Sequence, residues 1–214
     1  MTEAERLIQE TGIVAILRGF DEESTLATTA ALIRSGVRAV EITANTDGFL
    51  RTLETVSNAH DGTDVTLGAG TVLDAATAQA AIASGAEFLV TPTFDKGVVR
   101  TGNRYGVPVV TGVATPTEAL NASEAGATMC KVFPASSLGP GFVSALGGSL
   151  SQIPLVPTGG VSRENAAEFF EAGAVALGVG SAIAPTDAVD RGDFETVEQR
   201  AAEFTEVARQ YRTR

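Results

Sequence analysis

A lysine stands in the middle of a short apolar segment that has the composition of a buried strand. The segment reads MCKVFP, and Lys131 is its only charged residue. Lysine is almost never buried without a partner or a purpose, because removing its charge from water is costly. Three interpretations are open: a structural ion pair, a surface lysine on a misassigned strand, and a nucleophile. We favour the nucleophile, since desolvation favours the neutral amine that attacks a carbonyl.

A glutamate occupies a similarly unusual place in a second strand-like segment, VEITAN. Strand alternation puts Glu41, Thr43 and Asn45 on one face, which we expect to point inward. Beside Lys131, Glu41 is either half of a buried ion pair or the group that moves protons next to the amine. His60, the only histidine, lies in a polar segment that we expect to be a solvated loop. Proton transfer is therefore assigned to the carboxylate.

Glycines follow the last two strand-like segments. The first ends in VPTGGVS, with Gly159 and Gly160, and the second in GVGS, with Gly180 and Ser181. Glycine lets the backbone approach a ligand, and free N–H groups at the start of a helix bind anions. One glycine pair alone is an ordinary turn. Two of them at the last two strand ends predict a phosphate site and, with Lys131, a phosphorylated substrate that carries a carbonyl.

An arginine ends the first strand-like segment, AILRG. A guanidinium at a strand end suits two-point recognition of a carboxylate, although Arg18 as an exposed loop charge is the alternative. Gly70 and Thr71, at the end of another segment, can add a backbone or hydroxyl donor. The arginine therefore predicts an acidic substrate.

Short apolar, β-branched runs recur about every 20 to 26 residues, which is enough for one strand, one helix and two short loops each time. The pattern predicts eight β-α units closed into one (β/α)8 barrel over residues 1–214, with the chemistry at the carboxyl ends of the strands. A doubly wound sheet is the alternative. We expect a helix before the first strand and a final amphipathic helix opened by Asp193. The expected strands are residues 13–17, 38–43, 64–68, 87–91, 107–111, 128–132, 153–157 and 175–179.

The composition excludes several classes of protein. A formal net charge of −11 argues against binding a nucleic-acid backbone, which requires basic patches. One cysteine and one histidine argue against a metal centre. No apolar run is long enough to span a bilayer, and the first residues do not form a basic-then-apolar signal, so we expect a cytoplasmic protein without membrane partners.

At these residues the sequence resembles the 2-keto-3-deoxy-6-phosphogluconate (KDPG) aldolases, a family also known as 4-hydroxy-2-oxoglutarate aldolases. The resemblance covers essentially the whole chain and rests on the ordered motifs AILRG, VEIT, GAGTVLD, FLVTPTFD, CKVFPASSLGP, VPTGGVS and GVGSAI. It implies a class I aldolase, a lyase that forms a lysine Schiff base and releases pyruvate and D-glyceraldehyde 3-phosphate. It also implies a homotrimer that requires no metal and no cofactor.

The resemblance assigns a role to each matching position. Lys131 corresponds to the Schiff-base lysine and Glu41 to the proton-shuttling glutamate, and Thr71 is expected near the pyruvate carboxylate. The matching substrate-pocket positions are Thr71, Pro92 and Phe133, and the matching phosphate positions are Gly159, Gly160 and Ser181.

Three further positions bear on the substrate. One branch of the family grips the pyruvate carboxylate with an arginine where this chain has Asn45, and branches without it carry an arginine in the AILRG motif. The resemblance therefore implies that Arg18 supplies this charge. Relatives that cleave the galactonate epimer tend to have an apolar residue in place of Thr158, whereas a hydroxyl there can hydrogen-bond the C4 side of the substrate and favours the gluconate.

The same residues are compatible with three alternatives to a KDPG aldolase. AILRG, Asn45 and the stretch SSLGP also resemble the galactonate enzymes, so a 2-keto-3-deoxy-6-phosphogalactonate (KDPGal) aldolase or a dual-epimer enzyme is one alternative. A phosphosugar isomerase or epimerase would use Glu41 as a base and Lys131 as an electrophile. A non-catalytic phosphometabolite-binding barrel would hold the two residues as a structural ion pair.

Overall fold

Strands and helices alternate along the whole chain in the computed structural model, which describes residues 1–212. The strands are β1 (Ile13–Leu17), β2 (Ala39–Thr43), β3 (Thr66–Gly70), β4 (Phe88–Val90), β5 (Val109–Val113), β6 (Met129–Val132), β7 (Leu155–Pro157) and β8 (Leu177–Val179). The helices are α1 (Glu3–Thr11), α2 (Glu22–Arg34), α3 (Phe49–Ala59), α4 (Ala75–Ala83), α5 (Lys96–Tyr105), α6 (Pro116–Glu124), α7 (Ala135–Ser149), α8 (Arg163–Glu171), α9 (Thr186–Asp190) and α10 (Phe194–Arg212).

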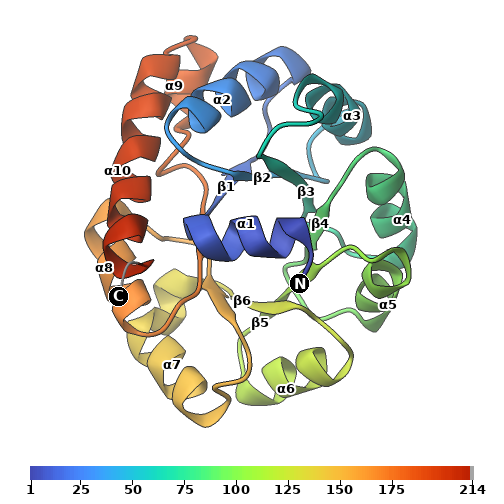
Figure 1. Ribbon diagram of the computed structural model, residues 1–214, viewed down its shortest axis with the longest axis vertical. Coiled ribbons are helices and arrows are strands. Elements are labelled where there is room, and N and C mark those ends of the chain that lie inside the picture. Colours follow the sequence, from blue (N-terminus) through green and yellow to red (C-terminus); the bar gives the residue numbers. More distant parts are fainter. Residues whose placement is uncertain (213–214) are drawn as a thin grey trace.

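The eight strands form one sheet in the order β7-β6-β5-β4-β3-β2-β1-β8. All paired strands are parallel, and β1 pairs with both β2 and β8. A parallel bridge between Thr158 and Gly178 joins the two ends of the sheet. Figure 1 shows the helices as an outer ring around the strands. The predicted (β/α)8 barrel is therefore confirmed, and the doubly wound sheet is wrong.

Apolar side chains fill the half of the barrel at the amino-terminal ends of the strands. Helix α1 lies across this end of the barrel (Figure 1) and contributes Ala4 and Ile8 to the packing. Because this plug closes the amino-terminal end, the carboxyl ends of the strands are left for chemistry. The strand residues of the plug are Val14, Ala39, Phe88, Val90, Val110, Met129, Val156 and Ala176.

Two strands lie two residues later than predicted, and both continue through glycines. Strand β3 covers Thr66–Gly70 and β5 covers Val109–Val113. A Cβ atom on Gly68 would stand 2.3 Å from the Phe88 ring, and one on Gly112 would stand 2.1 Å from the backbone of Pro92. These glycines therefore make room for a neighbour inside the barrel instead of ending the strand.

The final helix, α10, packs on the outside of the barrel against α2 and α8. Its apolar stripe, Val197, Ala201, Phe204 and Ala208, is buried, which confirms the predicted amphipathic helix. Near its end Tyr211 stacks on Phe170 of α8, with ring centroids 5.8 Å apart. Helices α8 and α10 are therefore held side by side over most of the length of α8.

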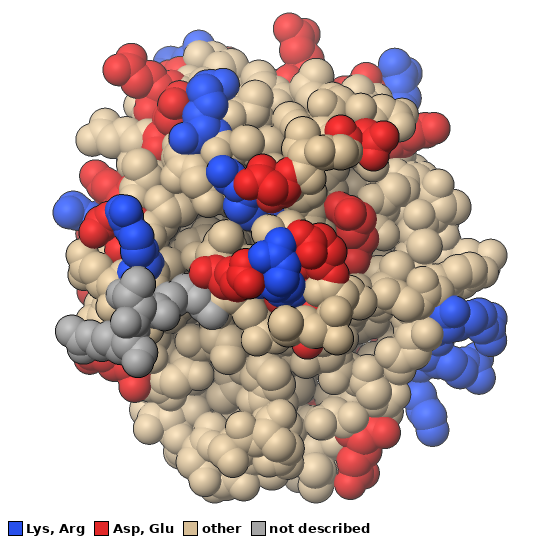
Figure 2. All heavy atoms as spheres, in the orientation of Figure 1, with Lys and Arg blue, Asp and Glu red and all other residues tan. Residues whose placement is uncertain are grey.

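The charged residues lie mostly on the surface. Figure 2 shows a cation flanked by carboxylates over α1, where Arg6 pairs with Glu3 and Glu10. None of the helices in residues 1–212 is long and apolar enough to cross a membrane.

Candidate active site

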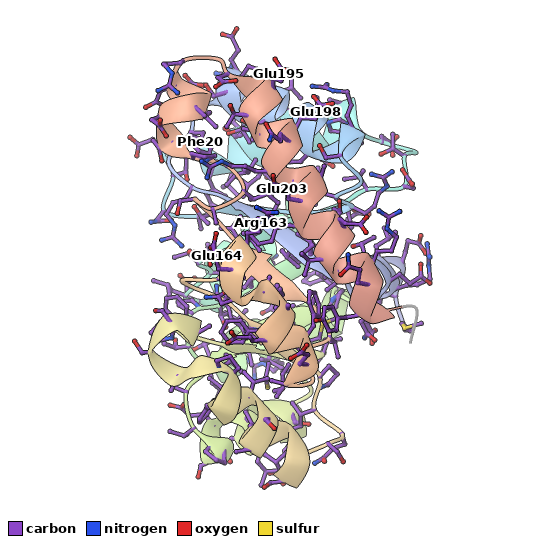
Figure 3. All side chains as sticks on the ribbon, turned by 90° about the vertical axis from the view of Figure 1, so that its left-hand side faces the viewer. Phe20, Arg163, Glu164, Glu195, Glu198 and Glu203 are labelled. Carbon is purple, nitrogen blue, oxygen red and sulfur yellow. The ribbon has the colours of Figure 1, made fainter. Side chains whose placement is uncertain are left out.

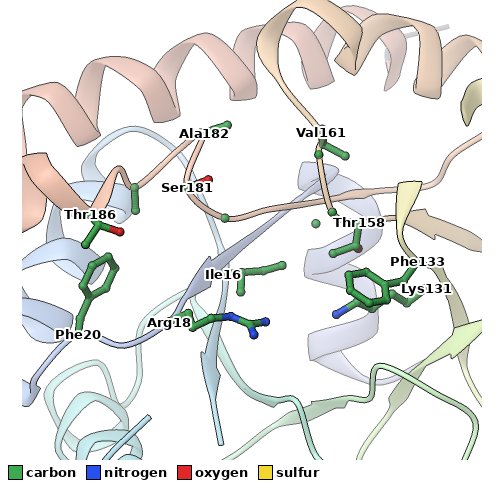
Figure 4. Close-up of a pocket in the computed structure, with 15 residues that line it drawn as sticks. Ile16, Arg18, Phe20, Lys131, Phe133, Thr158, Val161, Ser181, Ala182 and Thr186 are labelled. Atoms are coloured by element: carbon green, nitrogen blue, oxygen red, sulfur yellow. The ribbon is translucent and has the colours of Figure 1, made fainter. Parts of the chain in front are cut away.

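A cavity of about 300 Å³ opens at the carboxyl ends of β1, β6, β7 and β8 (Figure 4). Two of its residues, Arg18 and Lys131, are cations in a chain of net charge −11. The cavity therefore suits an anionic ligand. The predicted site residues in its wall are Arg18, Lys131, Phe133, Thr158, Gly159, Gly160, Gly180 and Ser181.

Strand β6 places Lys131 inside the barrel. Its neighbours Cys130 and Val132 face the outer helices, so alternation turns Lys131 inward, where only 4% of it is exposed. The ammonium nitrogen Nζ lies 5.2 Å from the centroid of the Phe133 ring, which provides a favourable cation–π contact. The interpretation as a surface lysine is therefore wrong.

Strand β2 buries Glu41 just behind the cavity wall, with 1% of the residue exposed. Desolvation raises the pKa of the Glu41 carboxyl above its ordinary value, although the charges of Lys131 and Arg18 act in the opposite direction. Its Oε1 atom has no hydrogen-bond partner among the described residues. A structural ion pair would be expected to satisfy that oxygen, so the arrangement favours a carboxyl held ready for proton transfer.

The loop after β7 presents free backbone donors to the cavity. Gly159 and Gly160 both have left-handed backbones, with φ of 87° and 79°. The Gly159 carbonyl accepts a bond from the Ser136 amide at 2.8 Å, and the Gly160 carbonyl accepts one from Asn165 Nδ2 at 3.0 Å. The amide N–H groups of the two glycines have no acceptor in residues 1–212. With the carbonyls tied back, these amides can receive an anion.

The loop after β8 is built in the same way. The Gly180 carbonyl accepts bonds from the amides of Ile183 and Ala184 at 2.9 and 3.0 Å. The amides of Gly180 and Ser181 have no acceptor within the described part of the chain. The two loops together thus form an end of the cavity that can bind a phosphate group.

Arg18 follows β1 and is exposed, as a loop charge would be, but its side chain extends into the cavity toward Lys131 (Figure 4). The next residue, Gly19, donates its amide hydrogen to Thr46 Oγ1 at 3.0 Å, which ties this turn to the loop after β2. A guanidinium held in this position can bind a carboxylate in two-point fashion.

Thr158 lies at the junction where the barrel closes. It is 4% exposed, and its hydroxyl donates to the Val156 carbonyl at 3.2 Å. A Cβ atom on Gly178 would stand 2.3 Å from Thr158 Oγ1, so the glycine leaves room for this side chain. Because its proton is engaged, the Thr158 oxygen can accept a hydrogen bond from a substrate hydroxyl.

Three predicted substrate positions lie outside the cavity wall, as Glu41 does. Asn45 is exposed in the turn after β2, because that strand ends at Thr43 and its alternation does not continue into the turn. Thr71 directly follows β3 with φ of 55°, a left-handed conformation that is strained for a β-branched residue. Pro92 is half-buried, with its backbone against Gly112.

Several wall residues were missed by sequence reasoning because they carry no reactive group. Strand alternation could have found Ile16, which lies two residues before Arg18 on the same face. The missed residues are Ile16, Phe20, Val161, Gly178, Ala182, Ala184 and Thr186.

The single cysteine and the single histidine lie apart from this chemistry. Burial raises the pKa of the Cys130 thiol to about 12, so the thiolate is not available at neutral pH. His60 is the first residue of the turn after α3, as expected for a loop position, and it is partly buried, which lowers its pKa. Within residues 1–212, no three His, Cys, Asp or Glu side chains are grouped to hold a metal ion.

Known proteins similar to this chain agree with the fold. The sequence model of the KDPG and KHG aldolase family matches residues 4–200. The 2-dehydro-3-deoxy-6-phosphogalactonate aldolase of Escherichia coli K12 is 37% identical over 200 residues, which are 92% of this chain and 95% of the relative. The 2-dehydro-3-deoxy-phosphogluconate aldolase of Treponema pallidum is 37% identical over 176 residues, or 82% and 83% of the two chains. A solved structure described as native KDPGal has a TM-score of 0.88 and 35% identity, covering 94% and 96%.

The barrel, its cavity and these relatives together define a lyase of the aldolase class. The chain belongs to the KDPG and KHG aldolase family. Its relatives are named for both the gluconate and the galactonate substrate.

Proposed function

We propose that this protein cleaves KDPG to pyruvate and D-glyceraldehyde 3-phosphate through a Schiff base on Lys131. One arrangement carries the proposal: a buried amine ends in a cavity that also contains two loops of free backbone donors. An amine and an anion site in one cavity match a ketone and a phosphate in one substrate.

In the first half of the reaction, the neutral amine of Lys131 adds to the C2 ketone and forms a carbinolamine. Glu41 gives a proton to the departing hydroxyl, so that water leaves and a protonated Schiff base remains. A carboxyl whose pKa is raised by burial is suited to this donation near neutral pH. Arg18 holds the substrate carboxylate, and the loops after β7 and β8 hold the phosphate.

In the second half, Glu41 takes the proton of the C4 hydroxyl, directly or through a water. The C3–C4 bond breaks, its electron pair moves into the iminium group, and D-glyceraldehyde 3-phosphate leaves. The pyruvyl enamine is then protonated at C3, and hydrolysis of the Schiff base releases pyruvate and regenerates the amine. The electron sink is the iminium on Lys131.

Thr158 supports the gluconate substrate, because its oxygen has lone pairs for the C4 hydroxyl. A KDPGal or dual-epimer enzyme is the second candidate, favoured by the Escherichia coli relative. We further propose that the protein acts in the cytoplasm as a homotrimer. Light scattering should then give three times the mass of one chain, and a monomer mass would contradict the trimer.

A coupled assay for pyruvate with the two C4-epimeric phosphorylated substrates tests the proposal. We expect cleavage without added metal or cofactor and a higher kcat/KM for KDPG than for the galactonate epimer. A reversed preference would establish the second candidate. If neither substrate yields pyruvate, the proposed function is wrong.

A further inference from the structure

A second cavity, of about 480 Å³, lies behind the phosphate end of the first. It separates α10 from the two loops, and Ala182 belongs to the walls of both cavities. Figure 4 shows α10 passing above Ser181 and Val161, which belong to the loops after β8 and β7. Val161, Ile183 and Ala184 hold the inner side of the two loops in the hydrophobic core. Across the second cavity, polar side chains connect the outer side of the loops to α10.

Two residues of α10, one helical turn apart, make these crossings. Arg200 donates from Nη1 to the carbonyl oxygen of Ala182 at 3.4 Å, so it reaches the loop after β8. Glu203 pairs through Oε2 with Nε of Arg163 at 3.4 Å, and Arg163 is the first residue of α8, directly after the loop that follows β7. Figure 3 shows Arg163 and Glu203 between the two helices.

The remainder of α10 is anchored independently of these contacts. Its buried residues Val197, Ala201 and Phe204 pack on the barrel, and Tyr211 stacks on Phe170. The helix is therefore a fixed support, and each crossing relates one loop to it. A phosphate bound between the loops requires that their amides lie a fixed distance apart. Hydrogen bonds weaken steeply when the distance grows or the angle departs from linear.

We propose that Arg200 and Glu203 are positioning residues that set the separation of the two phosphate-binding loops. The proposal rests on the proposed function of the cavity as a site for a phosphorylated substrate. It assigns α10 a role in substrate affinity, through the loops and without contact to the substrate. The contacts of the reacting carbons with Lys131 and Glu41 do not depend on it.

Kinetics with two substrates test this role. Partly exposed contacts of this kind contribute modestly, so Arg200→Met and Glu203→Gln should each raise KM for the phosphorylated substrate about threefold, and about tenfold together. KM for 4-hydroxy-2-oxoglutarate, which has no phosphate, and the extent of borohydride trapping with pyruvate should not change. The double variant Arg163→Glu/Glu203→Arg should restore the KM of the unmodified protein. Glu206→Gln is the matched control, because Glu206 pairs with Arg209 within α10.

A second measurement separates this proposal from the aldolase reaction. Inorganic phosphate should raise the Tm of the unmodified protein and of Glu206→Gln, but raise it less in Arg200→Met and Glu203→Gln. Equal shifts in all four proteins, or KM increases of equal size for both substrates, would overturn the positioning role. Absence of any shift in the unmodified protein would overturn it as well. If the unmodified protein does not cleave KDPG but inorganic phosphate shifts the Tm values as expected, only the proposed function is contradicted.

Discussion

The carboxylate of Glu41 lies directly over Gly70 on the neighbouring strand. A Cβ atom at position 70 would stand 1.7 Å from Glu41 Oε1, far inside the closest approach of real atoms. The two residues are adjacent because β2 and β3 pair in register, with Thr43 opposite Gly70. The glycine is therefore required for the position of the carboxylate.

Replacing Gly70 should displace the Glu41 carboxylate and so remove its function, although Glu41 itself is unchanged. In Gly70→Ala the carboxylate must move, so we expect kcat to fall by about 100-fold or more, the usual contribution of a positioned acid or base. Steady-state kinetics on KDPG would measure this. Gly148→Ala is the matched control, because Gly148 in α7 faces open space. Unchanged kcat in a folded Gly70→Ala protein would show that Glu41 is not needed where it lies.

The raised pKa of Glu41 makes a prediction about stability. The folded protein holds this proton more tightly than the unfolded chain, so between the ordinary pKa of 4.5 and the raised one the free energy of unfolding falls as pH rises. Glu41→Gln removes this penalty. Its Tm should match that of the unmodified protein near pH 4 and exceed it by roughly 2–6 °C at pH 8, although activity is lost.

Thermal unfolding across this pH range would measure the difference. Glu54→Gln, the same substitution at an exposed position of α3, controls for the loss of one negative charge. A Tm difference that is independent of pH, or a lower Tm for Glu41→Gln at pH 8, would show that the Glu41 carboxylate is not destabilising.

Arg18 should act on the carboxylate end of the substrate. Arg18→Met keeps the aliphatic stem but removes the charge, so we expect KM for KDPG to rise about 10- to 100-fold, the value of a charge-assisted hydrogen bond. The KM of Arg51→Met should stay normal, because Arg51 is an exposed residue paired with Glu22. Arg18 has no role in binding if the two variants have the same KM.

Thr158 should control the choice of epimer. In Thr158→Val the oxygen that can accept from the C4 hydroxyl is lost, so the ratio of kcat/KM for KDPG over its galactonate epimer should fall about tenfold. Thr158→Ser keeps the hydroxyl and should keep the ratio. The same ratio in Thr158→Val would mean that another residue distinguishes the epimers.

The barrel could be predicted because each β-α unit has the same length and the same apolar pattern. Lys131 and the glycine loops could be found because a cation in an apolar strand and paired glycines at strand ends are local signals. The ends of β3 and β5 could not be predicted. Gly68 and Gly112 continue their strands because they make room for Phe88 and Pro92, which lie about 20 residues away in the chain.

The wall of the cavity was predictable only in part, for a similar reason. Asn45 was assigned by continuing strand alternation past Thr43, where the backbone turns away. Phe20 enters the cavity through the path of the loop after β1, and Thr186 through the placement of the start of α9, and no local pattern encodes either. The contacts of Arg200 and Glu203 likewise arise from the packing of α10, a tertiary feature.

Borohydride reduction in the presence of pyruvate tests the central claim most directly. Lys131 and Lys96 are the only lysines, and Lys96 is exposed at the start of α5, so a peptide map distinguishes them without ambiguity. We predict one carboxyethyl group on Lys131 and none in Lys131→Met. An intact Lys131 peptide after reduction, or an adduct on Lys96 alone, would contradict the Schiff-base mechanism.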